Sequence, residues 1–334
     1  MGWSGTSGTR TDGVRGRLAD MNASAVYALA GATAGVISGV AVCPLDVIKT
    51  KLQAQGGFTK YGIIHEHYYE GLVGTTKTIW RTEGVKGFYR GVVPITLGYL
   101  PTWMVYFTVY EKAKKVLAKA SGFKEHPFAV HMVSALLAGS SSTTLTNPVW
   151  VVKTRLMTQN ANTSWYYRST IDAFRQMYKH EGIQSFYAGL LPALLGLTHV
   201  AIQFPLYEKF KQHFVPSADS GASRSAILGG IVVASCASKM CASVATYPHE
   251  VVRTRMQIQR GLPRTPGVVL DYHGIVRTFM SLLREEGWRV FYSGLGTNLV
   301  RTVPASAVTL LTYELVVAEI NKFKRDRGIE EVPT

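Results

Sequence analysis

Long apolar segments alternate with polar segments along this chain of 334 residues. A helix that crosses a lipid bilayer needs about 20 predominantly apolar residues. Four of the apolar segments contain no Asp, Glu, Lys or Arg, and the other two contain one cation each, Lys239 and Arg301. The pattern predicts an all-α membrane protein with six transmembrane helices, which cover residues 21–45, 91–110, 127–152, 188–207, 225–248 and 290–313.

Three polar segments join span one to two, span three to four, and span five to six. All three segments therefore lie on one side of the membrane, and both chain termini lie on the other. Each contains an amphipathic stretch that suits a helix at the membrane surface. A solvated loop helix explains each stretch alone almost as well, but the threefold occurrence favours a shared structural role. The stretches begin near Tyr69, Tyr167 and Tyr272, within polar segments 54–90, 158–187 and 258–289.

A ten-residue motif follows the first, third and fifth spans. It starts at Pro44, Pro148 and Pro248, so its copies are 104 and 100 residues apart. An acidic position lies two residues after the proline, and cations lie five and seven residues after it. Repetition at such a period indicates copies of one supersecondary unit.

A second motif, Glu-Gly-x-x-x-Phe-Tyr-x-Gly, has the same period and starts at Glu83, Glu181 and Glu286. The whole fold is therefore predicted to be three modules of about 100 residues. We place the repeats at 23–122, 123–220 and 221–324, between an N-terminal tail (1–22) and a C-terminal tail (325–334).

Small residues recur at helical spacing in the first span, at Gly31, Gly35 and Gly39. This spacing places them on one face of a helix and lets a neighbouring helix approach closely. We expect this face to pack against another span.

Charge distinguishes between possible partners. Charged residues make up 17% of the chain, below the roughly 25% that is usual for soluble domains. The net charge of +15 would suit a nucleic acid, but the cations lie between apolar segments and no nucleic-acid motif is present. Anionic lipid headgroups and an anionic substrate are the partners that this charge favours, and no nucleic acid is expected.

Enzymatic motifs are missing from the sequence. Cys43, Cys236 and Cys241 lie inside apolar segments, at spacings that match no metal or redox site. The histidines are scattered, and the sequence has no glycine-rich nucleotide fingerprint or nucleophile elbow. We expect no catalytic residues, no metal and no cofactor.

The charges that follow the motif prolines predict a gate. Proline in a helix removes a backbone hydrogen bond and kinks the chain, which membranes tolerate where neighbours or water satisfy the freed carbonyl. Three kinked helices around a pseudo-threefold axis would bring these charges together. The expected ion pairs are Asp46–Lys153 and Glu250–Lys49.

The third ion pair of this gate cannot form. Trp150 occupies the acidic position of the second repeat, opposite Arg253. A cation–π contact between them, worth about 0.5–2 kcal/mol, would partly substitute; simple packing of the Trp150 ring is the alternative. We call the six residues the first gate: Asp46, Lys49, Trp150, Lys153, Glu250 and Arg253.

A second set of charges recurs at the ends of the even spans, in a Tyr-Glu-Lys-x-Lys pattern whose last copy lacks the cations. The expected pairs are Glu111–Lys211 and Glu314–Lys114, which leaves Glu208 without a partner. Each patch alone also suits an ordinary solvated helix end. We call these five residues the second gate, and two gates at opposite ends of a threefold bundle predict alternate opening.

The cations inside the spans point to the substrate. A cation near the middle of a span costs about 2.5–3.5 kcal/mol on insertion scales, so it is expected to face a polar interior. Arg301 precedes Glu314 by thirteen residues, about 20 Å along a helix, and suits a phosphate or carboxylate that it can bind through two hydrogen bonds. A structural ion pair is the alternative for Arg301 and for Lys239.

Aromatic and small residues of the even spans would accept a planar base, although singly each also suits packing. With the two cations they predict a site for a nucleotide-like anion. The predicted substrate contacts are Gly98, Thr102, Trp103, Tyr106, Gly196, Leu197, Lys239 and Arg301.

The proline and Glu-Gly motifs make residues 23–320 resemble the mitochondrial carrier family. The resemblance implies six tilted transmembrane helices, three helices on the matrix side, and both termini in the intermembrane space of the inner membrane. It also implies alternating access, in which the first gate faces the matrix and the second the cytoplasm. The protein would function as a monomer.

Cardiolipin is a further partner that the resemblance implies, bound at helix N-termini. In the second repeat, Ser169 replaces the expected glycine, so that repeat departs from the family pattern at one site. The matching positions in this sequence are Gly71, Gly91, Gly189, Gly274 and Gly294.

Trp150 distinguishes branches within the family. It resembles the branch that carries pyrimidine nucleotides, NAD, FAD and folate-like compounds, and segments 97–107 and 147–157 are most similar to fungal mitochondrial NAD carriers. The expected activity is import of NAD+, as a substrate and not a cofactor, in exchange for AMP or ADP. A pyrimidine-nucleotide carrier is the nearest alternative and an FAD or folate carrier follows. An uncoupling-type proton leak is an alternative of another class.

Overall fold

The computed structural model describes residues 23–59, 69–119, 127–159, 163, 166–216, 223–259 and 274–325. Within these ranges the chain forms helices and short 3-10 turns and no strand, so the all-α prediction is confirmed. Tyr272 and nearly all of both predicted tails lie outside the described residues.

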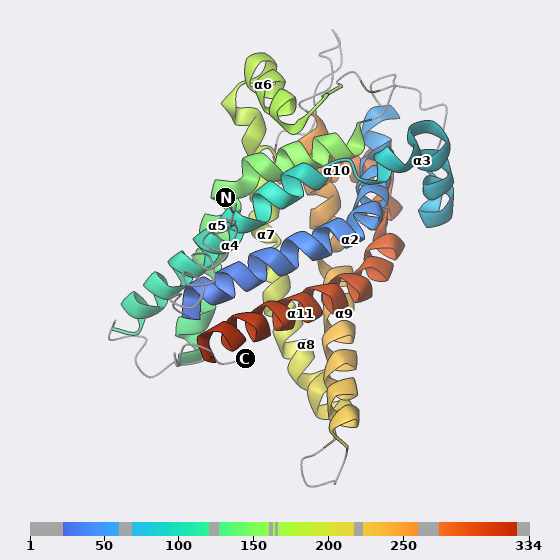
Figure 1. Ribbon diagram of the computed structural model, residues 1–334. Coiled ribbons are helices and arrows are strands. Elements are labelled where there is room, and N and C mark those ends of the chain that lie inside the picture. Colours follow the sequence, from blue (N-terminus) through green and yellow to red (C-terminus); the bar gives the residue numbers. More distant parts are fainter. Residues whose placement is uncertain are drawn as a thin grey trace, which may run out of the picture.

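Twelve helical elements follow one another along the described chain (Figure 1). They are α2 (Ala23–Thr59), α3 (Gly71–Phe88), α4 (Val92–Leu117), α5 (Pro127–Thr158), α6 (Thr170–Glu181), η2 (Ile183–Tyr187), α7 (Leu190–Leu195), α8 (Thr198–Phe214), α9 (Arg224–Gln259), α10 (Ile275–Glu285), η4 (Trp288–Tyr292) and α11 (Leu295–Arg325).

Among the described residues, five helices have the length and apolar composition of a membrane span: α2, α4, α5, α9 and α11. They correspond to five of the six predicted spans. The predicted span 188–207 is instead divided between α7 and α8. The N–H of Leu197 donates to the carbonyl of Leu194 (3.0 Å), and that of His199 to the carbonyl of Gly196 (3.1 Å). These tighter bonds to the third preceding residue replace α-helical ones and break the helix.

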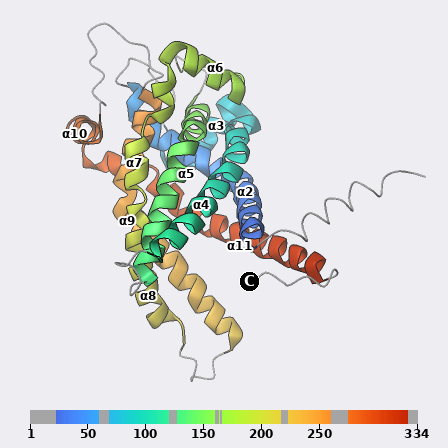
Figure 2. The ribbon, with the colours of Figure 1, turned by 90° about the vertical axis from the view of Figure 1, so that its left-hand side faces the viewer.

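The long helices form a bundle in which α11, α2, α4 and α5 pack side by side in that order. The start of α2 packs antiparallel against the end of α11, where Val26 and Ile320 share a buried cluster. Figures 1 and 2 show that α8 and α9 run as a pair and diverge from the other helices at the end away from α3, α6 and α10.

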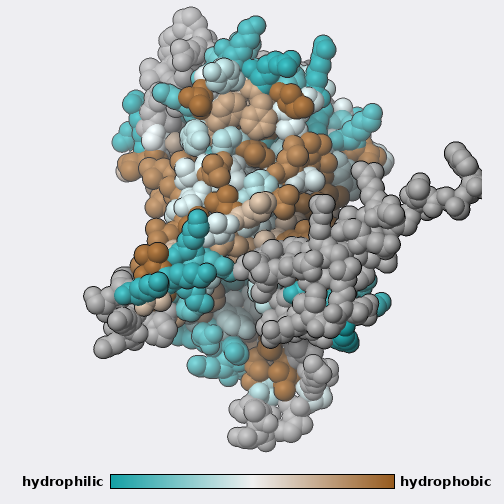
Figure 3. All heavy atoms as spheres, turned by 60° about the vertical axis from the view of Figure 1, so that its left-hand side comes forward, coloured by the Kyte–Doolittle hydropathy of each residue, from teal (hydrophilic) through white to brown (hydrophobic). Residues whose placement is uncertain are grey.

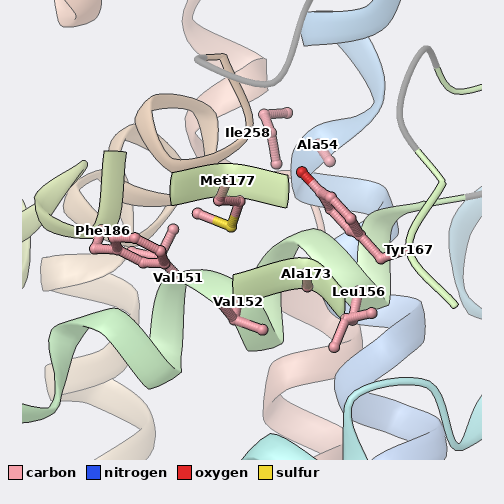
Figure 4. Close-up of a cluster of buried hydrophobic side chains, with 9 residues drawn as sticks. All are labelled: Ala54, Val151, Val152, Leu156, Tyr167, Ala173, Met177, Phe186 and Ile258. Carbon is pink, nitrogen blue, oxygen red and sulfur yellow. The ribbon is translucent and has the colours of Figure 1, made fainter. Parts of the chain in front are cut away.

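The three predicted amphipathic helices are present as α3, α6 and α10, all at one end of the bundle (Figures 1 and 2). Buried apolar side chains fasten α6 and η2 to the ends of the spans. Phe186 of η2 and Met177 of α6 pack with Val151 of α5, and Ala54 and Ile258 reach the same cluster from α2 and α9 (Figure 4). This core holds the segments that follow the motif prolines.

Apolar side chains also cover the outside of the bundle. On α4, Leu97, Leu100 and Met104 are exposed, and their helical spacing places them on one outward face. Figure 3 shows apolar side chains across the middle of one face of the molecule, with hydrophilic side chains gathered toward its upper end. Such an exterior fits a bilayer, where no hydrophobic force drives apolar side chains inward.

The glycine face of α2 packs against α4, as the spacing predicts. A Cβ atom at Gly31 would lie 3.2 Å from the Trp103 ring, and one at Gly35 would lie 2.5 Å from the Tyr99 ring. Aromatic rings of α4 therefore fill the space that missing side chains leave on α2.

Candidate functional site

The segments after the three motif prolines meet at one level of the bundle. Pro44, Pro148 and Pro248 lie inside α2, α5 and α9. Each helix continues for about three to four turns past its proline and ends beside the amphipathic helices. The cations and carboxylates of the first gate lie in these turns, between the interior of the bundle and the end that carries α3, α6 and α10.

Two ion pairs join neighbouring repeats here. Lys153 Nζ lies 3.1 Å from Asp46 Oδ2, and Lys49 Nζ lies 2.5 Å from Glu250 Oε2. Each pair joins the acid of one repeat to the first cation of the next, the combination that the repeat pattern predicts. All four side chains are largely shielded from solvent, which strengthens the attraction between opposite charges.

Trp150 departs from the predicted arrangement. The cation over its ring is Lys153, whose Nζ lies 5.4 Å from the ring centroid; no cation–π contact with Arg253 is recorded within the described residues. Lys153 follows Trp150 by three residues on the same helix, where side chains meet most readily. The indole N–H donates to Thr146 Oγ1 (3.1 Å), and Tyr99 packs against the indole in an edge-to-face arrangement at 5.7 Å.

Arg301 extends the ion-pair cluster. Its Nη1 lies 2.9 Å from Asp46 Oδ1, so Asp46 is shared between Lys153 and Arg301. Its Nη2 donates to Asn298 Oδ1 at 3.3 Å. The structural ion pair that the sequence leaves open for Arg301 is therefore present, although the side chain also lines the cavity.

Asn298 connects the cations of the cluster and has no counterpart among the predicted site residues. Its Oδ1 accepts hydrogen bonds from Lys49 (2.9 Å) and Arg301, and its Nδ2 donates to Ser243 Oγ (2.7 Å). The only signal in the sequence is its place three residues before Arg301, on the same helical face.

A cavity of about 450 Å³ lies against this cluster. Four cations line it, Lys49, Lys153, Arg253 and Arg301, against the two carboxylates of Asp46 and Glu250, which leaves an excess of two positive charges when His249 is neutral. Hydroxyl and amide groups supply further hydrogen bonds. The rest of the lining comprises Thr50, Gln53, Thr102, Thr143, Thr146, Trp150, Thr154, Met157, Ala193, Gly196, Leu197, His249, Thr254 and Gln257.

Four of the eight predicted substrate contacts line this cavity: Thr102, Gly196, Leu197 and Arg301. The glycine matters at Gly196, where a Cβ would lie 2.7 Å from His249 Nε2. Broken helix α7–α8 presents Gly196 and Leu197 to the cavity. Several threonines that sequence patterns do not distinguish from packing residues complete the wall.

The other four predicted contacts lie elsewhere. Gly98 is buried behind the Trp150 ring, and Trp103 packs on α2 and stacks with Phe107. Tyr106 stacks with Tyr110, 6.1 Å away. Lys239 donates to Ser306 Oγ of α11 at 3.3 Å. Gly98, Trp103 and Lys239 contact neighbouring helices, and Tyr106 contacts aromatic side chains of its own helix.

A second set of ion pairs lies on the far side of the first gate. The second cation of each proline motif pairs with the glutamate of the Glu-Gly motif in its own repeat. Lys51 and Glu83 are 2.6 Å apart, Arg255 and Glu286 are 2.9 Å apart, and Arg155 pairs with Glu181 through both carboxylate oxygens. The three cations are fully buried.

The same three cations also join each repeat to the next. Arg155 Nε donates to the Gln257 carbonyl (3.0 Å), Arg255 Nε to the Gln53 carbonyl (2.7 Å), and Lys51 Nζ to the Gln159 carbonyl (3.3 Å). These contacts close a ring around the pseudo-threefold axis. The sequence signal for them was the co-occurrence of the second cation and the glutamate in every repeat.

The second gate is not assembled in this structure. Within the described residues, no ion pair joins any two of its five members, Glu111, Lys114, Glu208, Lys211 and Glu314. The predicted Glu111–Lys211 pair would join α4 to α8, and α8 diverges with α9 from the bundle at this end (Figure 2). The predicted Glu314–Lys114 pair would join α11 to α4, and both of these helices pack on α2, which lies between them. The ion pairs of the first gate are formed, and those of the second gate are not.

The predicted lipid-binding glycines all lie at helix starts with positive φ, at Gly71 (56°), Gly91 (88°), Gly189 (72°), Gly274 (89°) and Gly294 (81°). Only glycine adopts such angles without strain, and the free N–H groups of a helix start attract anions. A cavity of about 840 Å³ lies between the start of α3 and the start of α11, with Arg289 in its wall.

The helix start of the second repeat differs. Ser169 has φ −151°, and its hydroxyl accepts a hydrogen bond from the N–H of Asp172 (3.1 Å). The Asp172 carboxylate accepts from the N–H of Arg168 and from the Gln176 amide, and these bonds hold the pKa of Asp172 below its usual range. Side chains therefore occupy donors that the glycine sites leave free.

Metal binding has no structural support in the described part of the chain, where no group of three His, Cys, Asp or Glu could hold an ion.

Comparison with known proteins agrees with the three-module organisation. A family model described as "Mitochondrial carrier protein" matches residues 21–121, 124–218 and 228–324. The chain is 47% identical to "Mitochondrial nicotinamide adenine dinucleotide transporter 1" of Saccharomyces cerevisiae, over 90% of this chain and 79% of the yeast protein.

Two further relatives differ in name and source. "Nicotinamide adenine dinucleotide transporter 2, mitochondrial" of Arabidopsis thaliana is 40% identical, over 88% of this chain and 79% of the plant protein. "Solute carrier family 25 member 36" of Gallus gallus is 33% identical, over 87% of this chain and 96% of the chicken protein.

Proposed function

The chain belongs to the mitochondrial carrier family, and from this premise we propose that it imports NAD+ across the inner mitochondrial membrane in exchange for a nucleotide such as AMP or ADP. The observation that carries the proposal is the cavity on the bundle axis. It has an excess of two positive charges, and the two ion pairs of the first gate lie beside it.

The charge and polarity of the lining suit a nucleotide. Phosphate oxygens accept charge-assisted hydrogen bonds from arginine and lysine, and arginine binds them through two donors. The threonine hydroxyls, and the Gln257 Nε2 that has no hydrogen-bond partner in the described part of the chain, offer partners for ribose and base. Thr102, Gly196, Leu197 and Arg301 are our proposed contacts for this conformation.

The identity of the nucleotide follows from the relatives. The yeast and plant proteins that are 47% and 40% identical to this chain are named as transporters of nicotinamide adenine dinucleotide. The pyrophosphate of NAD+ carries two negative charges, which equal in number the two excess positive charges of the cavity lining. A pyrimidine nucleotide has the same anionic chemistry and is the second candidate.

Alternating access follows from the state of the two gates. To open the first gate, the Lys49–Glu250 and Lys153–Asp46 pairs must separate, which costs several kcal/mol when charges are shielded from water. Substrate phosphates that pair with the released cations offset this cost, and a ligand shifts an equilibrium only through such differential contacts. Closure of the second gate would then complete the exchange.

Cardiolipin is the lipid partner that we propose. We assign cardiolipin to the cavity between the starts of α3 and α11, because two helix N-termini and Arg289 face it. The membrane orientation has the first gate toward the matrix and both termini in the intermembrane space. Each three-repeat chain encloses its own axis, so a monomer carries out transport.

Uptake into liposomes tests the proposed function. Purified protein is reconstituted, labelled NAD+ is added outside, and vesicles contain NAD+, AMP, ADP, a pyrimidine nucleotide or no nucleotide. Saturable uptake that requires internal NAD+, AMP or ADP is expected. Uptake that responds only to pyrimidine nucleotides would move the assignment to the second candidate. Proton flux without any counter-nucleotide would instead indicate an uncoupling-type leak.

A further inference from the structure

The acidic position that Trp150 occupies leaves one cation of the first gate without its partner. Asp46 pairs with Lys153 and Glu250 pairs with Lys49, so each acid serves the first cation of the next repeat. By the same threefold pattern, the residue at position 150 is the expected ion-pair partner of Arg253. An indole carries no negative charge, and within the described residues Arg253 has no ion pair.

Arg253 is nonetheless held in the interior. Its side chain lines the cavity, and its buried Nε has no hydrogen-bond partner in the described part of the chain. An unpaired charge away from water costs considerable free energy. A guanidinium at such a site is therefore prepared for an anion that enters from the cavity.

Trp150 is fixed in a way that keeps it from compensating Arg253. Its ring face is occupied by Lys153, its edge is packed against Tyr99, and its N–H is bound to Thr146. Both acids of the cavity form ion pairs with other cations, Asp46 with Lys153 and Arg301, and Glu250 with Lys49. Within the described residues, neither forms an ion pair with Arg253.

From these contacts we infer that Arg253 is a phosphate-binding residue of the transport site and that Trp150 creates it by removing the competing acid. The inference rests on the proposed function, because it takes the substrate to be a nucleotide. Arg253 supplies one of the two excess positive charges, and the cluster of Lys153 and Arg301 around Asp46 supplies the other. The subsite would therefore distinguish nucleotides by their number of phosphates.

The test measures binding by purified protein in lipid nanodiscs, from the substrate concentration that gives half of the maximal thermal shift. The probes form two series, adenosine, AMP and ADP, and uridine, UMP and UDP. Arg253→Gln is expected to weaken ADP binding about tenfold or more, the size of a lost charge-assisted hydrogen bond, and to leave adenosine binding unchanged.

Arg253→Lys keeps the charge but loses the planar fork of donors. Its affinity for ADP is expected to lie between that of the wild type and that of Arg253→Gln. Arg284→Gln on α10, an exposed cation outside the cavity, is the matched control.

A second variant restores the missing acid. Trp150→Glu is expected to weaken ADP binding as much as Arg253→Gln does, and to raise the unfolding temperature of the empty protein by adding a third ion pair to the first gate. Adding Arg253→Gln to Trp150→Glu is expected to cause no further loss of ADP binding. A double variant whose losses simply multiply would overturn the role of Trp150.

The outcomes separate this inference from the proposed function. If the wild type binds the uridine series and not the adenosine series, NAD+ is the wrong substrate, and the phosphate dependence of Arg253 is read from UMP and UDP. If Arg253→Gln weakens adenosine and ADP equally, or weakens neither, the phosphate assignment is wrong whichever base is bound. A wild type that binds no nucleotide overturns both proposals.

Discussion

At the scale of single residues, the two ion pairs of the first gate differ in their surroundings. Lys49–Glu250 has Asn298 as its additional contact, whereas Asp46 is shared between Lys153 and Arg301. Swapping the acid and the cation should therefore have different effects on transport in the two pairs.

We predict that reversing the Lys49–Glu250 pair restores more transport than reversing the Asp46–Lys153 pair. Lys49→Glu and Glu250→Lys should each reduce exchange strongly, and the double variant should recover a large part of it. In the other double variant, a lysine at position 46 would face Arg301, and like charges repel. Initial rates of exchange in liposomes provide the measurement, and equal recovery of the two pairs would contradict the shared role of Asp46.

Asn298→Ala gives a second prediction at this scale. It removes the oxygen that accepts hydrogen bonds from Lys49 and Arg301 and leaves both half-buried donors without that partner. We expect a loss of about 1–3 kcal/mol in the stability of this conformation, measured as a lower unfolding temperature without substrate. Thr309→Ala, elsewhere on α11, is the control because its hydroxyl donates to the carbonyl of Ala305 in its own helix; an equal loss in both variants would contradict the role of Asn298.

At the scale of helices, the buried ion pairs hold the ends of α3, α6 and α10 to the spans. Each pair joins the second cation of a proline motif to the glutamate of the Glu-Gly motif in the same repeat. Each of these cations also donates a hydrogen bond to a backbone carbonyl of the next repeat. Loss of one partner would leave a buried charge without compensation.

Arg155→Met tests this element. We expect it to destabilise the protein by about 3–5 kcal/mol, because Glu181 would keep its charge without its partner. Combining it with Glu181→Leu should recover much of that loss, because no buried charge then remains. Thermal unfolding in nanodiscs measures both, with the exposed Arg175→Gln on α6 as control; no recovery in the double variant would contradict the explanation.

The start of α6 gives a prediction about lipid. Ser169→Gly removes the hydroxyl that binds the Asp172 N–H and makes this helix start resemble the other five. The intrinsic loss of capping is only a few tenths of a kcal/mol. We expect stronger stabilisation of the variant by added cardiolipin than of the wild type, measured as the change in unfolding temperature per amount of lipid. An unchanged cardiolipin response would show that the freed N–H is not a lipid site.

At the scale of the whole molecule, one gate is formed while the other is apart, and the cavity lies against the formed gate. The described conformation matches one of the two states of the alternating cycle that we propose. The helix pair α8 and α9 diverges most from the bundle (Figure 2), so its return toward α5 and α11 is the expected closing motion.

Chemical labelling can test which side reaches the cavity. Thr143 lines the cavity, and we expect Thr143→Cys, in a variant whose three native cysteines are replaced, to react with a membrane-impermeant thiol reagent from the side opposite α3, α6 and α10. Substrate should slow the reaction several-fold by occupying the cavity. Reaction from the side of α3, α6 and α10 alone would contradict the assignment of the formed gate.

Repeat patterns in the sequence determine the helical bundle, its three modules and the partners of the first gate. Span length, proline position and charge spacing are local properties, and threefold repetition tells which local element meets which. The Asp46–Lys153 and Lys49–Glu250 pairs follow from that symmetry alone.

Only the tertiary structure decides how the repeats deviate from their symmetry. The sharing of Asp46 by Arg301, the place of Lys153 over Trp150 and the burial of Gly98 behind that ring depend on helix rotation and side-chain packing between distant segments. The second gate shows the same limit: its charges are encoded in every repeat, but whether they meet depends on how α4, α8 and α11 are placed relative to one another. Sequence thus determined which groups are available, and packing decided which of them are neutralised and which, like Arg253, remain for a ligand.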